Sequence, residues 1–359
     1  MNETIEIRLF DPKAGEAILN QAHGIHFPSP DSAAKRRSYV SWLTSNPVPG
    51  SIYLAAYVDG SFASFLGFMA REVVGQGRTL RAALAFGAMT LPEFQGRGLY
   101  RRLAVAGWDM AARGGFDIAL GYTNRPYVLS LELRMGWRAI VRCPVMALPL
   151  DLSAVVAKAA PFLRHVAPLA AIGNPAVRAI VRRVAGRVSA ADCVVEKVAD
   201  FSSDFDGFAG ALTNGANFTF IKDWKTLSWL YLSPYNPFTY DILEARRNGA
   251  LVGFAVGRPM DLRGLSGYGI LDLICLPGHE DVLAPLAARL VADAVRAKPQ
   301  IIAALVSPGD ASQRALARVG FINSGQSFTL IGRSLVDDLP AALRESAPWQ
   351  NSWGNNDTV

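Results

Sequence analysis

Apolar and polar residues alternate along the chain with two periodicities, one typical of strands and one typical of helices. Residues 79–91 and 116–122 are short apolar stretches, and each predicts a buried strand. Between them, a helix over residues 99–113 is predicted by an apolar stripe of Leu99, Leu103, Ala106 and Met110. A second helix is expected over residues 127–135, because Gly136 follows it and glycine commonly ends helices. This order predicts an α/β fold with a mixed sheet and helices on its faces.

The same landmarks occur twice along the chain. Ser-Trp-Leu is followed by a proline five residues after the tryptophan, once at Trp42 and again at Trp229. Each copy continues with an alternating strand, an Asp-Gly or Asn-Gly turn that favours a hairpin, and a second strand. The first copy closes on Gly136-Trp137 and the second on Gly320-Phe321. We therefore expect two similar domains in tandem.

The repeat sets the expected boundaries: an N-terminal domain over residues 1–150, a helical linker over 151–193, a C-terminal domain over 194–336 and a tail over 337–359. The linker is rich in alanine and in basic residues, and it predicts one or two amphipathic helices broken at Pro168 and near Gly173. Docking on a membrane surface is one alternative for these helices. Packing across the two domains is the other.

Composition limits the kinds of partner and compartment. The 359 residues are 51% hydrophobic and 18% charged, with a formal net charge of +6, which is typical of a folded protein with a preference for anionic ligands. No block of five basic residues occurs, so we expect no nucleic-acid partner. The acidic N-terminus and the lack of a long apolar run predict a cytoplasmic protein without a transmembrane segment. The three cysteines are far apart, and only His23 and His26 are close together, so no metal site is expected.

Residues 91–103, LPEFQGRGLYRRL, place two glycines directly before the first turn of a helix. A helix N-terminus presents unpaired N–H groups and a partial positive charge, so it binds anions. Gly96 and Gly98 would let a phosphate approach these N–H groups, and three arginines add charge of the matching sign. No Gly-Lys-Ser/Thr follows, so this is not a Walker loop.

These residues resemble a known signature. Thr90-Leu91-Pro92 followed by Gln95-Gly96-Arg97-Gly98 is similar to the acetyl-CoA motif of the GNAT acyltransferases, and Asn124 with Gly136-Trp137 resembles the second motif of that family. The resemblance implies a tandem GNAT fold in which the loop holds the pyrophosphate and the pantetheine arm lies between the strands that end at Thr90 and Tyr122. It also implies an oxyanion donor among the backbone N–H groups near Thr90 and Leu91. The acetyl-CoA-binding residues that it implies are Met89, Thr90, Leu91, Gln95, Gly96, Arg97, Gly98, Leu99, Tyr100 and Asn124.

The chain departs from the family pattern at two positions. Tyr100 stands where glycine or alanine is usual, and Glu132 stands where the family often has its general-acid tyrosine. Tyr127 lies about one turn earlier on the same expected helix and can substitute as the acid. We expect Glu132 and Tyr127 to be the catalytic residues, with no metal.

The second copy lacks the glycine pair. Its corresponding loop reads Pro277-Gly278-His279-Glu280-Asp281, in which two carboxylates would repel a pyrophosphate. We expect the second copy to be degenerate and to shape the acceptor site or a homodimer. We also expect one CoA per chain.

The resemblance implies an N-acyltransferase that moves an acetyl group from acetyl-CoA to a primary amine by direct attack. We expect the acceptor to be a small-molecule amine, with an amino sugar as one candidate. Two alternatives stay open: an aminoacyl transferase of the peptidoglycan-bridge type, and a non-catalytic CoA-binding protein.

Overall fold

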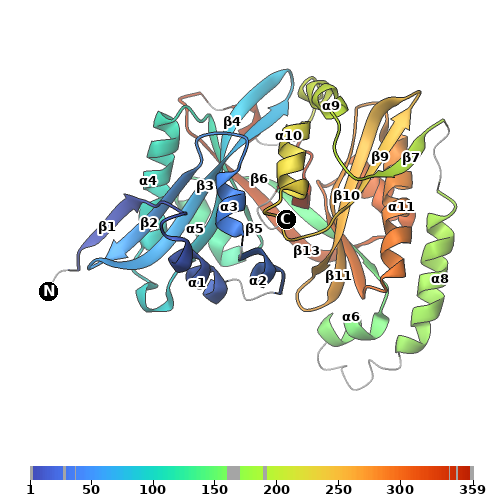
Figure 1. Cartoon of the computed structure of the whole chain (residues 1–359), viewed down its shortest axis with the longest axis horizontal. Coiled ribbons are helices and arrows are strands. Elements are labelled where there is room, and N and C mark those ends of the chain that lie inside the picture. The colour runs from blue at the N-terminus through green and yellow to red at the C-terminus, as the bar shows by residue number, and fades with distance from the viewer. Residues whose placement is uncertain are drawn as a thin grey trace. The chain divides into compact units, whose positions relative to one another are not determined.

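The computed structural model describes residues 3–26, 30–36, 38–159, 170–188, 192–338, 340–344 and 347–355. The chain divides into two compact units, each with a sheet flanked by helices (Figure 1). Unit 1 comprises Met1–Val141, Ala216–Pro237 and Thr329–Trp349. Unit 2 comprises Arg142–Gly215, Phe238–Phe328 and Gln350–Val359.

The sheet of unit 1 has the strand order β1-β2-β3-β4-β5-β13, with β8 paired to β3. Neighbouring strands are antiparallel except β4 and β5, which are parallel. The strands are β1 (Ile5–Leu9), β2 (Ile52–Val58), β3 (Ser61–Gly75), β4 (Arg78–Thr90), β5 (Ile118–Thr123), β8 (Thr219–Phe220) and β13 (Ile322–Ser334). The helical segments are α1 (Glu16–His26), α2 (Pro30–Arg36), α3 (Tyr39–Thr44), η1 (Pro92–Phe94), α4 (Leu99–Arg113), α5 (Pro126–Arg134), α10 (Trp224–Leu227), η4 (Ser228–Leu232) and η6 (Ala341–Leu343).

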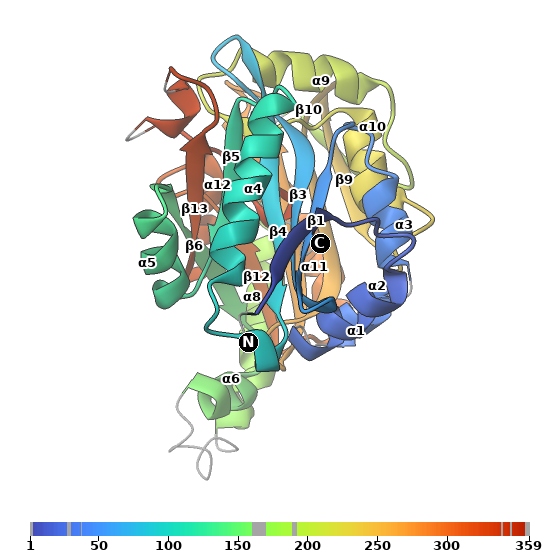
Figure 2. The same cartoon turned by 90° about the vertical axis from the view of Figure 1, so that its left-hand side faces the viewer.

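Helix α4 covers one face of this sheet, as Figure 2 shows. Its buried stripe includes Leu99, Leu103 and Trp108, which join one apolar core with Leu66 and Phe68 of β3. Such an i, i+4 stripe orients a helix toward the sheet that it covers. The helix start at Leu99 is therefore held in place by core packing.

Two tryptophans from the two sequence copies pair inside unit 1. The rings of Trp42 and Trp229 stack with centroids 4.6 Å apart and an interplanar angle of 10°. Each indole N–H donates to the other residue's backbone carbonyl, at 3.2 Å from Trp42 and 3.0 Å from Trp229. The tryptophan that marks each sequence copy therefore contacts its counterpart from the other copy.

Unit 2 has the strand order β6-β12-β11-β10-β9-β7, in which only β11 and β12 are parallel. The strands are β6 (Arg138–Pro149), β7 (Val194–Val198), β9 (Asp241–Arg247), β10 (Ala250–Asp261), β11 (Ser266–Cys275) and β12 (Ile301–Leu305). The helical segments are α6 (Leu152–Ala159), η3 (Ala171–Gly173), α8 (Asn174–Ala185), α9 (Asp204–Thr213), η5 (Glu280–Val282), α11 (Leu283–Arg296), α12 (Ala311–Val319) and η7 (Trp353–Asn355).

The compact units differ from the consecutive domains expected over 1–150 and 194–336. In unit 1 the strand beside β5 is β13, which ends the second copy, and in unit 2 the strand beside β12 is β6, which ends the first. The expected tail over 337–359 also contributes buried residues, among them Trp349 in unit 1 and Trp353 in unit 2. Pairing partners at a sheet edge depend on tertiary structure, so sequence order alone does not predict this exchange.

The expected linker over 151–193 contains α6 and α8, and the expected break at Pro168 lies outside the described residues. The break near Gly173 coincides with η3 and the start of α8. Within the part of the chain that the structure describes, no helix is both long enough and apolar enough to cross a membrane.

Candidate functional site

The parallel strands β4 and β5 pair along only part of their length. Their register ends at Leu84 with Leu120. From there β4 continues to Thr90, with its other edge paired to β3, and β5 continues to Thr123, with its other edge paired to β13. A gap therefore opens between two strand edges, and such edges can bind an extended ligand through backbone groups.

A bulge accounts for the bend in β4. Gly87 and Ala88 both oppose the single residue Leu66 of β3, so neither has a register partner there. Gly87 has a φ of +62°, which glycine adopts without strain. An extra residue in one strand bends it, and this bend coincides with the gap. The sequence signal for the bulge was a glycine inside an apolar strand, which the sequence prediction did not use.

The end of β4 is fixed by hydrogen bonds to β3. Ser64 Oγ donates to the carbonyl of Met89 at 2.7 Å and lies 2.8 Å from Thr90 Oγ1. The N–H of Leu91 donates to the carbonyl of Ala63 at 2.9 Å. The N–H of Leu91 already has a partner, so among the backbone groups near Thr90 and Leu91 it is not free to serve as an oxyanion donor.

The loop after β4 turns sharply into α4. Gly96 and Gly98 have φ values of +79° and +71°, and Gly98 is the N-cap of the helix. A Cβ built on either glycine would meet no atom within 4 Å, so both face open space. The first helical bond runs from the N–H of Arg102 to the carbonyl of Gly98 at 3.2 Å, which leaves the N–H groups of the first turn without intrahelical acceptors. This helix start has the geometry of an anion site.

The three arginines of the loop differ in their surroundings. Arg97 forms an ion pair with Glu3, donates to the carbonyl of Glu93 at 3.0 Å and lies 5.2 Å from the centre of the Phe94 ring. Arg97 therefore stabilises the loop itself. Arg101 and Arg102 are exposed and supply positive charge beside the helix start.

Of the other residues implied by the family motif, Gln95 and Asn124 are exposed, and Gln95 Nε2 donates to the carbonyl of Thr90 at 3.2 Å. Met89 and Leu99 have buried side chains, so only their backbones can face a ligand.

Tyr100 and Glu132 form a buried pair between α4 and α5. The Tyr100 hydroxyl donates to Glu132 Oε1, and Glu132 is 4% exposed. Burial raises the pKa of Glu132, and the Tyr100 hydroxyl and the Trp137 indole offset part of that rise. Burial and the Glu132 carboxylate together hold the pKa of Tyr100 well above its usual value. The bulky side chain at this position of the motif is thus directed toward α5, a pairing that the sequence did not predict.

The structure does not bring Glu132 and Tyr127 together. Five positions on a helix correspond to a rotation of about 140°, so the two side chains lie on different sides of α5. Tyr127 is 66% exposed, and its hydroxyl accepts a hydrogen bond from Arg125 at 3.1 Å.

Unit 2 contains a second gap of the same kind. The parallel register of β11 and β12 ends at Ile270 with Ala304, and β11 continues to Cys275. The two copies therefore share the divergence of their parallel strands.

Residues 351–355 occupy the second gap. The backbone N–H and Nδ2 of Asn351 both donate to Ser307 Oγ, at 3.0 and 3.1 Å. Ser352 Oγ donates to Asp272 Oδ1 at 2.5 Å. Ser307 follows β12 and Asp272 belongs to β11, so this buried segment bridges the two strands just beyond their last pair.

The polar groups of the loop before α11 already have hydrogen-bond partners within the protein. The N–H of Gly278 donates to Glu280 Oε1 at 3.0 Å. Arg247 donates to Asp281 Oδ2 at 2.6 Å and lies 3.0 Å from Nδ1 of His279. This helix start therefore offers carboxylates where the first copy offers open backbone.

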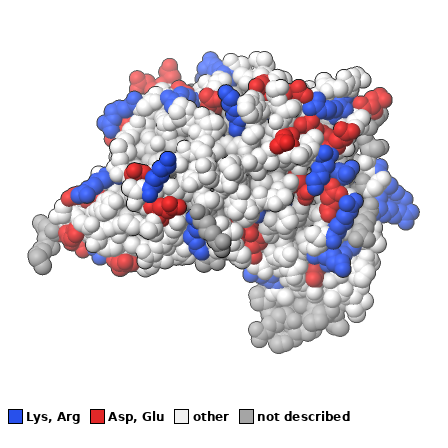
Figure 3. Space-filling view, viewed as in Figure 1, with Lys and Arg blue, Asp and Glu red and all other residues white. Residues whose placement is uncertain are grey.

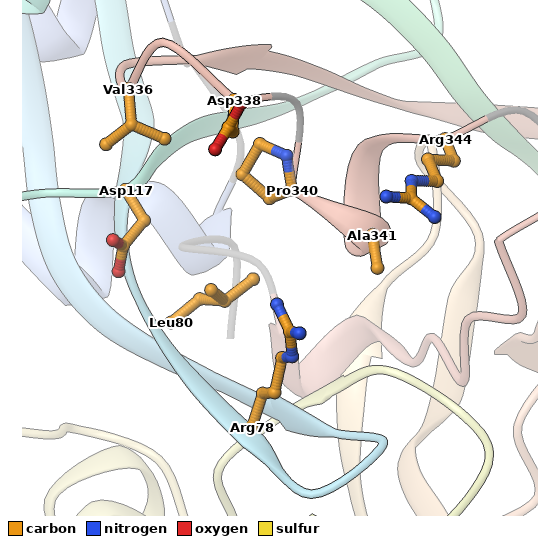
Figure 4. Close-up of a pocket in the computed structure, with 8 residues that line it drawn as sticks. All are labelled: Arg78, Leu80, Asp117, Val336, Asp338, Pro340, Ala341 and Arg344. Atoms are coloured by element: carbon orange, nitrogen blue, oxygen red, sulfur yellow. The ribbon is translucent and has the colours of Figure 1, made fainter.

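A hollow of about 560 Å³ lies at the opposite end of β4, and Figure 4 shows Arg78 and Arg344 pointing into it. Leu80 also lines it, and about 23 Å of strand separate that residue from the bulge at Gly87, at roughly 3.3 Å per residue. The hollow is therefore remote from the bulge at Gly87 and from the helix start that follows β4.

No protein-family model and no curated protein sequence matches this chain. Solved structures do match. A GCN5-related N-acetyltransferase from Anabaena variabilis ATCC 29413 is 13% identical with a TM-score of 0.61, over 93% of this chain and 73% of that one. A tandem GNAT protein from the clavulanic acid biosynthesis pathway is 12% identical with a TM-score of 0.57, over 94% of this chain and all of that one. N-myristoyltransferase from Saccharomyces cerevisiae, solved with myristoyl-CoA, is 10% identical with a TM-score of 0.60, over 92% and 83%.

These likenesses define the class of fold. The chain has the GNAT fold in its tandem arrangement, as the loop motif and the repeat predicted.

Proposed function

We propose that this chain is an N-acyltransferase that takes an acetyl group from acetyl-CoA in unit 1. One observation carries the proposal: the strand gap between β4 and β5 lies next to an open helix start with two glycines at positive φ. Backbone edges suit the amides of a pantetheine arm, and the helix start suits a pyrophosphate. The solved GNAT structures add support through their fold.

The reaction that we propose is direct attack of a primary amine on the thioester carbonyl. The nitrogen–carbon bond forms and the carbon–sulfur bond breaks, the amine loses a proton and the CoA thiolate gains one. Gly87 and Ala88 of the bulge are our candidates for the oxyanion donors, because they have no register partner on β3. They lie on β4 shortly before Thr90 and Leu91, near which the family resemblance implies the donor.

Tyr127 is our candidate for the acid that protonates the thiolate, since it is exposed on the first turn after β5. Glu132 is our candidate for the base. Its carboxyl is buried behind Tyr100, so a proton must reach it through the Tyr100 hydroxyl.

The second copy is proposed to have no CoA site. Residues 351–355 fill its gap, and Glu280 and Asp281 stand at its helix start. We propose that it serves the fold and the acceptor site instead.

The test combines binding and turnover on the full chain. Calorimetric titration with acetyl-CoA should give one site per chain, and release of free thiol should be measured over amino sugars, amino acids, polyamines, aminated antibiotics and peptide N-termini. Thiol release that requires one class of amine would support the proposal. Two equivalent CoA sites would contradict the asymmetry, and CoA binding without turnover on any amine would identify a CoA-binding protein instead.

A further inference from the structure

The segment between the two copies carries the whole charge surplus of the chain. Residues 152–188 contain no aspartate or glutamate and six basic residues: Lys158, Arg164, Arg178, Arg182, Arg183 and Arg187. Without these six, the 36 Lys and Arg of the chain fall to 30, which equals its number of Asp and Glu. The net charge of +6 is therefore local to this one segment.

Helix α8 in this segment has one face committed to the core of unit 2. Val181 is buried in that core, and Val177 and Val188 pack against it. Figure 1 shows α8 alongside α11 of the same unit. Packing against this core therefore accounts for the valines on the inner face of the helix. The residues on its outer side have no such packing role.

Two large apolar side chains of this region are exposed. Ile180 is 62% exposed and Ile172, in the turn before the helix, is 80% exposed. Arg183 and Arg187 are exposed. Arg183 lies three positions after Ile180 and so on the same helical face, and Arg187 lies in the turn that follows the helix. We call Ile172, Ile180, Arg183 and Arg187 the α8 surface. On the face of the molecule that Figure 3 shows, Lys and Arg are interspersed with Asp and Glu.

Exposed isoleucines flanked by cations, with no acid in the segment, suit a lipid interface. Such a helix lies in the plane of the membrane, with apolar side chains below the headgroups and arginines at their level. Each cation near an anionic leaflet strengthens binding several-fold. A nucleic acid would use the arginines and gain nothing from the isoleucines, so the pair of side-chain types favours lipid.

We propose that the α8 surface docks on membranes that contain anionic lipids. This interaction is independent of acyl transfer, and it accounts for the charge, the exposure of both isoleucines and the lack of acids together.

The test is co-sedimentation of the full chain with vesicles of phosphatidylcholine alone or mixed with phosphatidylglycerol. We expect binding only to the anionic vesicles and its loss at about 1 M salt, where the Debye length is about 3 Å. The double variant Arg183→Glu and Arg187→Glu should weaken binding at least about tenfold. Ile180→Ser should also weaken it, and because Ile180 is exposed this variant should keep the melting temperature of the parent.

Arg113→Glu with Arg318→Glu is the matched control, since both arginines are exposed on other helices and the charge change is the same. Equal loss of binding in the control would overturn the proposal in favour of a net-charge effect. Absence of vesicle binding in the parent would overturn it outright. If the Ile180→Ser variant binds vesicles as well as the parent does and duplex DNA displaces them, the ligand of the α8 surface would be a nucleic acid rather than lipid.

Discussion

Replacement of Gly98 by alanine should separate the binding role of the loop from its folding role. Gly98 caps α4 with a φ of +71° and a ψ of 18°, in the left-handed region. An alanine in this conformation costs roughly 1–2 kcal/mol in backbone strain. Its Cβ would meet no protein atom within 4 Å, so no steric cost adds to that strain in the free chain.

A bound pyrophosphate changes this balance. The open space in front of Gly98 is where the helix-start N–H groups would hold the phosphates, so the new methyl group would displace them. Each 1.4 kcal/mol lost in binding is a tenfold loss of affinity, and we expect at least that for Gly98→Ala. Gly98→Asp should lose more, because like charges placed together cost several kcal/mol.

Gly60 provides the matched control. It lies in the hairpin between β2 and β3, with a φ of +81° and likewise no atom within 4 Å of an added Cβ. Gly60→Ala and Gly98→Ala should therefore lose similar unfolding free energy in urea titrations, while calorimetry should record weaker acetyl-CoA binding only for Gly98→Ala. Equal affinity in the two alanine variants would refute the assignment of the pyrophosphate to this loop.

Three other changes test separate parts of the structure. Tyr127→Phe and Glu132→Gln should each lower kcat by about 10²-fold or more with CoA affinity retained; full turnover in both would place the acid and base elsewhere. Asp310 caps α12 through Gln313, and burial raises the pKa of its carboxyl to about 6. Because the folded state then binds the proton more tightly, stability should fall as pH rises from about 4 to about 6, by up to roughly 3 kcal/mol. Asp310→Asn should flatten this slope in urea titrations at several pH values, and an unchanged slope would assign it to other groups. Trp229→Phe removes one buried hydrogen bond and part of a stacked pair, so it should lower the unfolding free energy by about 2 kcal/mol. Trp224→Phe is its control, because Trp224 is exposed. Equal losses in the two variants would contradict a stabilising role for the Trp42–Trp229 pair.

The elements around the loop could be predicted from the sequence because each has strong local signals. The helix expected over 99–113 is α4 with the same bounds, and the strand expected over 79–91 is β4 within one residue at each end. Apolar periodicity and the glycines at the ends suffice for such segments. The tandem fold followed from the repeat, which is also visible in the sequence.

Other features depend on contacts that local sequence does not encode. The exchange of β6 and β13 depends on which sheet edges meet, and neither strand differs in pattern from one that stays with its own copy. The Tyr100–Glu132 pair joins residues 32 positions apart, and no periodicity relates them. The 351–355 segment was expected to lie in a tail, yet it is buried, with Asn351 and Ser352 hydrogen-bonded to Ser307 and Asp272 at the second gap.

The two gaps differ in what lies beside them, and this difference is the basis for proposing a ligand site in one copy only. Parallel strands that diverge leave backbone groups that must be satisfied, by a ligand or by the protein. In unit 2, Asn351 and Ser352 occupy this gap and hydrogen-bond the side chains of Ser307 and Asp272 beside it. Removal of that segment alone would still leave the start of α11 unlike that of α4, because Glu280 and Asp281 stand there and the Gly278 N–H donates to Glu280. In unit 1 the divergence of the strands lies beside a helix start whose two glycines face open space, and it is this coincidence, rather than the fold, that favours a ligand there.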